Sequence, residues 1–220
     1  ALNLSWRDGI NTMMATIGDL GTRMAGIELA VKGEENLWLE RPAVFIFNHQ
    51  SNADMFIGAK LLRKDARAIA KKELKYTPVG PLFMAAGVIF VDRGNREKAI
   101  EALKPAADAL QRGISIAIAP EGTRSYDYKL GRFKKGAFHI AMQAGVPIVP
   151  MVIKNAHDVL PRGSALIRPT AVEVVVLPPV STADWTIDNM DERIEEIRAL
   201  YLAELGQTED TKYEIEVVEE

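Results

Sequence analysis

The chain has 220 residues, of which 48% are hydrophobic, and a formal net charge of −3, which suits one α/β domain with a full core. It has no cysteine, so disulfides, zinc–thiolate sites and cysteine nucleophiles are excluded. Residues 188–220 carry a net charge of −9 and the remainder carries +6. This basic remainder would attract anionic ligands or anionic membrane surfaces. The alternative is that its charges form an ordinary solvated surface.

The N-terminal stretch 5–30 carries an amphipathic helical pattern. The apolar side chains that recur at helical spacing are Trp6, Ile10, Met13, Met14, Ile17, Leu20 and Met24. Glycines at 18, 21 and 26 are expected to bend or break this helix. The stripe fits a helix lying in a bilayer interface and equally a helix packed on the domain's own core. We treat 1–27 as a candidate membrane anchor, although no apolar run approaches the roughly 18 residues of a transmembrane helix.

Beyond this segment, short apolar strands alternate with helices. Strands are expected at 28–32, 43–47, 66–70, 88–91, 114–119, 146–153 and 172–177. Helices are expected from Ser51 or Asn52 to Leu62, and at 78–86, 95–113, 134–144 and 189–205. The order predicts an α/β fold, a mostly parallel mixed sheet flanked by helices on both faces.

Prolines and the C-terminal composition add three local expectations. Pro147 and Pro150 favour an edge or a bulge for strand 146–153. Pro105 favours a kink or a break in helix 95–113, for which Asn95 is the expected N-cap. The domain is expected to span 28–205, and 206–220 is an acidic tail in which 215–218 could add a last edge strand.

The stretch 43–54 places a base and a carboxylate on the loop after a buried strand. The apolar run ends at Asn48, His49 follows, and Asp54 lies in the first turn of the next helix. Such loops usually carry the sites of α/β folds, and the spacing allows Asp54 to reach one ring nitrogen of His49. The alternative is structural: 51–54 has the form of a capping box, and the helix dipole favours an early Asp without catalysis.

Four segments carry a recognisable pattern. Residues 48–54 fit H-x4-D, 87–93 fit G-x-x-F-x-x-R, 120–125 read P-E-G-T-R-S, and 146–150 fit V-P-I-x-P. Together, in this order and spacing, they resemble the glycerolipid acyltransferase family, whose members include the 1-acyl-glycerol-3-phosphate acyltransferases. The resemblance covers about 28–177, so 28–205 is interpreted as an acyltransferase domain.

This resemblance implies direct acyl transfer from a thioester to a substrate hydroxyl. His49 would act as general base, and Asp54 would hold its tautomer and stabilise the imidazolium. There is no G-x-S-x-G nucleophile elbow. Ser51 is expected as a helix cap, which argues against an acyl-enzyme on it.

The candidate substrate-binding residues lie mainly in the segments 87–93 and 120–125. We assign the phosphate of the acceptor to Arg93 and Arg124, because guanidinium groups match phosphate oxygens. The Gly122 N–H or the Thr123 hydroxyl is a candidate donor to the oxyanion. Glu121 either binds the acceptor, as the resemblance implies, or forms a salt bridge with the adjacent arginines. Secondary candidates for phosphate contact, against a solvated surface, are Lys72, Lys134 and Lys135.

The resemblance also sets the expected substrates and location. The donor would be acyl-CoA or acyl carrier protein, and the acceptor lysophosphatidate, with glycerol-3-phosphate or another lysophospholipid as the alternative. No cofactor is expected, and no metal, because His49, His139 and His157 show no ligand spacing. Other classes are a non-catalytic lipid-binding module and a hydrolase. The expected partner is a membrane surface rather than nucleic acid, with a peripheral or monotopic location on the cytoplasmic face.

Overall fold

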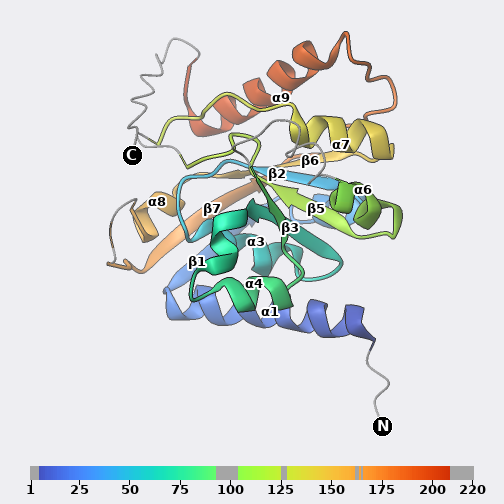
Figure 1. Ribbon diagram of the computed structural model, residues 1–220. Helices are drawn as coiled ribbons and strands as arrows, with labels where there is room; N and C mark the ends of the chain where they lie inside the picture. The colour runs from blue at the N-terminus through green and yellow to red at the C-terminus, as the bar shows by residue number, and fades with distance from the viewer. Residues whose placement is uncertain (1–4, 93–103, 125–127, 162–163, 165, 209–220) are drawn as a thin grey trace.

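The structure, a computed structural model, describes residues 5–92, 104–124, 128–161, 164 and 166–208. Within these residues seven strands form one sheet in the order β1-β7-β6-β2-β5-β3-β4 (Figure 1). The strands are β1 (Ile27–Lys32), β2 (Val44–Phe47), β3 (Ala66–Lys71), β4 (Ile89–Val91), β5 (Ser115–Ile118), β6 (Ile148–Ile153) and β7 (Thr170–Val176). Every neighbouring pair is parallel except β6 with β7. The predicted mostly parallel mixed sheet is therefore confirmed.

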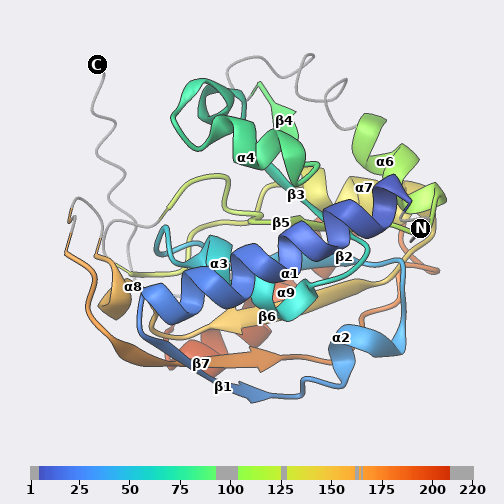
Figure 2. The same cartoon turned by 90° about the horizontal axis from the view of Figure 1, so that it is seen from below.

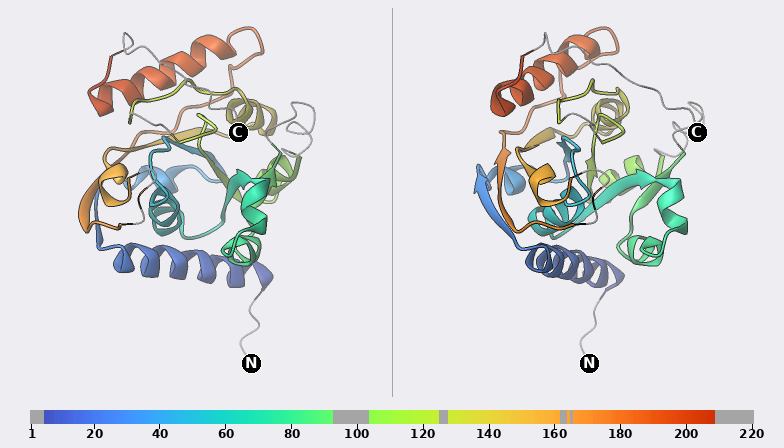
Figure 3. Two further views of the ribbon diagram at one scale, coloured as in Figure 1. Left: turned by 60° about the vertical axis from the view of Figure 1, so that its left-hand side comes forward. Right: turned by 90° about the vertical axis from the view of Figure 1, so that its left-hand side faces the viewer.

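Helices cover both faces of this sheet, as predicted. One face packs on α2 (Asn36–Leu39), α3 (Asp54–Leu62) and α8 (Ala156–Val159), and the other on α6 (Lys104–Gln111), α7 (Gly136–Ala144) and α9 (Met190–Leu205). A 3-10 turn, η1 (Lys72–Tyr76), and α4 (Gly80–Ala85) connect β3 to β4. The two side views show α9 and α1 on opposite sides of the sheet (Figure 3).

Helix α1 (Trp6–Met24) lies outside α3 and runs unbroken through Gly18 and Gly21. The break expected at Gly18 or Gly21 is absent, and these glycines instead allow close helix packing. A Cβ on Gly18 would lie 2.3 Å from the Lys60 main-chain nitrogen, and one on Gly21 would lie 2.1 Å from the Phe56 ring. The helix ends just before Gly26, whose φ of +63° turns the chain into β1.

The apolar stripe of α1 is only partly covered by the domain. Ile10 is buried, so core packing is confirmed for that part of the stripe. Trp6, Leu20 and Met24, which form the outer face of the helix, are 78%, 56% and 77% exposed. An open apolar groove of about 470 Å³ lies between α1 and α4, which run beside each other in Figure 2. Among the described residues no helix has both the length and the hydropathy of a membrane span.

Strand β6 departs from the prediction. It lies between β7 and β2 with all six residues buried, so the expected edge position is wrong. A hydroxyl from α9 satisfies the main chain beside Pro150: Tyr201 donates to the Ile46 carbonyl (2.7 Å) and accepts from the Met151 N–H (3.1 Å). A central strand thus accommodates a residue without an N–H donor.

The other predicted strands and helices lie within a few residues of the observed ones, whereas the short elements α2, η1 and α8 were not predicted. Helix α6 is described from Lys104, so the expected Asn95 cap and most of that predicted helix lie outside the described residues. The candidate edge strand 215–218 also lies outside them.

Candidate active site

The carboxyl ends of the parallel strands meet at one edge of the sheet. His49 follows β2, Glu121 follows β5 and His157 follows β6. This edge is the usual place of a site in an α/β sheet. The loops after β2 and β5 meet at this edge, where the His49 N–H donates to Glu121. Arg93, a predicted phosphate ligand, lies outside the described residues.

His49 and Asp54 form the pair that their spacing predicts. The ring Nδ1 lies 2.8 Å from Asp54 Oδ2, and the two side chains are 28% and 0% exposed. Because an ionised carboxylate only accepts hydrogen bonds, Nδ1 carries the proton and Nε2 has the lone pair. Nε2 has no hydrogen-bond partner within the part of the chain that the structure describes. This geometry leaves Nε2 available to accept a proton, as the predicted role of general base requires.

Asp54 also holds the loop that carries His49. Its Oδ2 accepts the main-chain N–H groups of Gln50 and Ser51, each at 2.9 Å. Helix α3 begins at Asp54 after Ala53, without a side-chain cap. The predicted cap at Ser51 or Asn52 is therefore wrong, because the polar groups satisfy the loop rather than the helix terminus.

The buried Ser51 hydroxyl is already used within the fold. It donates to the Leu160 carbonyl at 2.8 Å and accepts from the Ala53 N–H at 3.1 Å. Burial and these two bonds support the prediction that Ser51 is not a nucleophile.

Glu121 meets main-chain groups rather than cations. Its Oε1 accepts the His49 N–H at 2.7 Å, and its Oε2 accepts the Gly131 N–H at 2.8 Å. No ion pair between Glu121 and Arg124 is present in the described residues, so the expected salt bridge to that arginine is wrong. Burial raises the pKa of the Glu121 carboxyl from 4.5 to about 7, against the opposing effect of the two N–H donors.

The turn after Glu121 contains both candidate donors to the oxyanion, the Gly122 N–H and the Thr123 hydroxyl. Gly122 has a φ of +77°, and its N–H donates to the Ala119 carbonyl at 3.1 Å. This N–H is thus used within the turn and is not the free oxyanion donor that we expected. Thr123 is exposed and Arg124 is half-buried beside it. Their roles at a substrate stay predictions.

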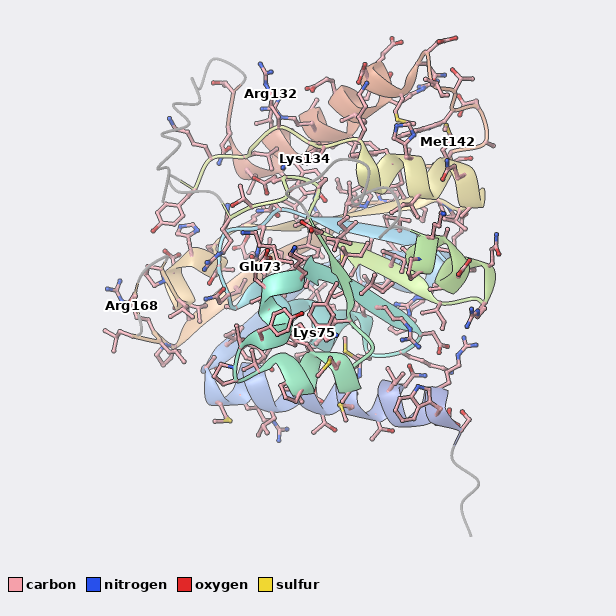
Figure 4. All side chains as sticks on the ribbon, viewed as in Figure 1. Glu73, Lys75, Arg132, Lys134, Met142 and Arg168 are labelled. Atoms are coloured by element: carbon pink, nitrogen blue, oxygen red, sulfur yellow. The ribbon has the colours of Figure 1, made fainter. Side chains whose placement is uncertain are left out.

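The three candidate lysines lie in different surroundings. Lys134 lies over the turn, since its Nζ would be 2.9 Å from a Cβ on Gly122. Figure 4 shows Lys134 among these loops and Arg132 pointing outward beside α9. Lys135 instead pairs with Asp191 of α9 at 2.7 Å, and Lys72 pairs with Asp92 at 2.6 Å. Only Lys134 is brought to the Glu121 turn by these contacts.

Several residues around the site were missed by sequence reasoning. The Asn48 amide pairs with both the N–H and the carbonyl of Ile153, each at 2.7 Å, and ties the His49 loop to the end of β6. Gln50 lies 3.1 Å from His157 Nδ1. That ring stacks on Tyr128 with centroids 4.0 Å apart. Polar residues inside the 48–54 segment were a signal for such contacts, but nothing in the sequence identified their distant partners.

The fold is a mostly parallel α/β sheet with a histidine–aspartate pair at its carboxyl edge, an arrangement that suits removal of a proton from a substrate hydroxyl. The comparisons with known proteins identify the class. The chain belongs to the acyltransferase family, whose model matches residues 28–154. It is an enzyme of the type to which the 1-acylglycerol-3-phosphate O-acyltransferases belong.

The similarity to known proteins extends beyond residues 28–154. The chain is 36% identical to the 1-acyl-sn-glycerol-3-phosphate acyltransferase of Limnanthes alba over 191 residues, which is 86% of this chain and 67% of that protein. It is 37% identical to the enzyme of the same name from Saccharomyces cerevisiae, over 80% of this chain and 59% of that one. These relatives are therefore longer than this chain.

A solved structure is also similar. The crystal structure of the 1-acyl-sn-glycerophosphate (LPA) acyltransferase PlsC from Thermotoga maritima superposes with a TM-score of 0.75 at 27% sequence identity. The superposition covers 90% of this chain and 80% of that chain. The likeness therefore includes segments outside 28–154.

Proposed function

We propose that this protein transfers a fatty acyl group from an acyl thioester to the free hydroxyl of lysophosphatidate, giving phosphatidate. The observation that carries the proposal is the 2.8 Å contact between His49 Nδ1 and Asp54, which leaves Nε2 available as a base. The names of the relatives support lysophosphatidate as the acceptor. We propose acyl-CoA or acyl carrier protein as the donor, with no metal and no further cofactor.

His49 would act twice in the reaction. Its Nε2 takes the proton of the acceptor hydroxyl as the oxygen attacks the thioester carbonyl, and the buried Asp54 carboxylate stabilises the imidazolium that forms. The tetrahedral intermediate then collapses, and the sulfur leaves with the proton from Nε2. The ester C–O bond forms, the C–S bond breaks, and the ring returns to its starting tautomer.

The phosphate of the acceptor would meet the cations near this edge. Arg124 follows the Glu121 turn, and the Lys134 ammonium lies over Gly122. We include Arg93 from the sequence pattern. Guanidinium groups suit phosphate oxygens through paired N–H donors, and lysine adds a point charge. Glycerol-3-phosphate, or another lysophospholipid, shares this chemistry and is the alternative acceptor.

The test offers palmitoyl-CoA with lysophosphatidate, with glycerol-3-phosphate or with no acceptor, and follows both free thiol and lipid mass. We expect phosphatidate from the first mixture only. Lysophosphatidate formed in the second would keep the mechanism and change the acceptor. Equal thiol release without an acceptor would identify a hydrolase. If all three are silent, the same set is run with acyl carrier protein as donor, and silence there would favour a lipid-binding module.

We further propose that the protein sits peripherally or monotopically on the cytoplasmic face of a membrane, through the outer face of α1. The exposed Trp6, Leu20 and Met24 and the neighbouring apolar groove support this placement. Insertion of such side chains among lipid headgroups buries apolar area. No nucleic acid is proposed as a partner.

Charged substitutions on that outer face are expected to weaken membrane binding. Leu20→Glu with Met24→Glu should lower binding to vesicles of phosphatidylcholine and phosphatidylglycerol at least about tenfold, because two apolar anchors become anions. The matched control is Leu39→Glu with Ile187→Glu, which changes side chains that are 64% and 75% exposed elsewhere. Vesicle co-sedimentation measures both. Equal binding by the two double variants would contradict the placement.

A further inference from the structure

Glu121 is a buried acid at the junction of three segments of the site. Its residue is only 6% exposed, and each carboxylate oxygen accepts a main-chain N–H, from His49 and from Gly131. No cation is paired with it in the portion of the chain that the structure describes. A carboxyl group placed in this way presents little surface to a substrate.

The main-chain N–H groups of the His49 loop donate to two different carboxylates. Glu121 takes the N–H of His49, and Asp54 takes the next two, from Gln50 and Ser51. Asp54 additionally holds the His49 ring through Nδ1. The ring is thus fixed by one acid and its main chain by the other, so both acids determine where Nε2 points.

The second contact of Glu121 holds the segment 131–134. A Cβ on Gly131 would lie 2.9 Å from Glu121 Oε2, so this approach requires glycine. The Gly131 carbonyl accepts from Arg198 Nε of α9 at 3.3 Å, and the Lys134 N–H donates to the Pro120 carbonyl at 2.8 Å. The segment is therefore held on both sides, with the Lys134 ammonium beside the turn.

We infer that Glu121 is a positioning residue, which fixes the main chain of His49 and the 131–134 segment, and that it is not a ligand of the acceptor. The inference rests on the proposed acyl transfer for its kinetic consequences. It replaces both earlier interpretations of this residue, acceptor binding and a salt bridge to the arginines. Removing a positioning contact lowers the rate of the chemical step, whereas removing a ligand weakens acceptor binding.

Two variants test the positioning role, one that changes Glu121 and one that changes its partner Gly131. Glu121→Gln leaves one N–H facing an amide NH2, because an amide has a single acceptor oxygen. Gly131→Ala keeps the acid but pushes it away from its partner. We expect both to lower kcat at least about tenfold with the acceptor KM unchanged within about twofold. Glu28→Gln, on an exposed residue of β1, is the control and should behave as the wild type.

A raised acceptor KM at unchanged kcat in Glu121→Gln, or a Gly131→Ala enzyme with wild-type kinetics, would overturn the inference. Gly131→Ala retains the charge, so it remains informative if Glu121→Gln fails to fold. Conversely, parallel losses of kcat in the two variants support a shared positioning role.

A measurement without substrate separates this inference from the proposed function. The groups that act on the charge of Glu121 are His49 and Asp54, and Tyr201 of α9 experiences that charge in turn. Because burial raises the pKa of Glu121 to about 7, folding is favoured by this carboxyl below about pH 4.5, and the contribution is lost as the pH rises through about 7. Urea unfolding at a series of pH values measures this loss. In the wild type the folding equilibrium constant should fall by up to about 300-fold as the pH rises. Glu121→Gln should lack this fall, because the amide does not titrate. Matching pH dependences would show that the acid is not buried at this junction, whatever the substrate.

Discussion

His49→Ala is expected to lower the rate of acyl transfer by about 10²–10⁴-fold, the usual worth of a general base. The ring is 28% exposed, and one hydrogen bond, to Asp54, holds it. Its removal leaves Asp54 with the two main-chain donors that define the loop. The fold should therefore survive, and the loss should appear in kcat with little change in the KM of either substrate.

Thiol release from palmitoyl-CoA, measured with lysophosphatidate present, gives the rate, and thermal unfolding checks the fold. His139→Ala is the matched control, because His139 is a half-buried histidine in the middle of α7. A His49→Ala enzyme within about threefold of wild type would rule out His49 as the general base.

The His49–Asp54 pair was predictable because its members lie five positions apart on a loop between a buried strand and a helix. Geometry over such a distance is set locally. The junction at Glu121 was not predictable in this way. Its partners are main-chain N–H groups 72 and 10 positions away. Every residue except proline carries such a donor, so the sequence did not single out these two.

The errors in the fold have a similar origin. Rules about proline and glycine describe one chain segment by itself. Pro150 is tolerated in the centre of the sheet because the Tyr201 hydroxyl, 50 positions from Met151, satisfies the neighbouring main chain. Gly18 continues a helix because α3 occupies the space of its missing side chain. The alternation of strands and helices, by contrast, is carried by hydrophobic periodicity, which tertiary contacts reinforce.

Asp54→Asn is expected to separate the charge of this residue from its hydrogen bonds. All three contacts of the carboxylate, with His49 Nδ1 and two main-chain N–H groups, use Oδ2. Oδ1 is buried and has no hydrogen-bond partner among the described residues. An asparagine can therefore place its oxygen where Oδ2 lies and its NH2 where Oδ1 lies. The loop and the Nδ1–H tautomer are then kept and the negative charge is lost, while the NH2 takes the buried place of Oδ1.

Without that charge the imidazolium formed during proton transfer loses its counter-ion, and we expect kcat to fall roughly 10²-fold. Asp54→Ala is the comparison, because it also leaves the Gln50 and Ser51 N–H groups without their acceptor, at about 1–3 kcal/mol each. Urea unfolding should therefore separate the two variants more clearly than turnover does. An Asp54→Asn enzyme with full activity would mean that Asp54 only shapes the loop, and the structural interpretation of the 51–54 segment would then replace the catalytic one. A loss confined to kcat in a protein of near wild-type stability can come only from the charge.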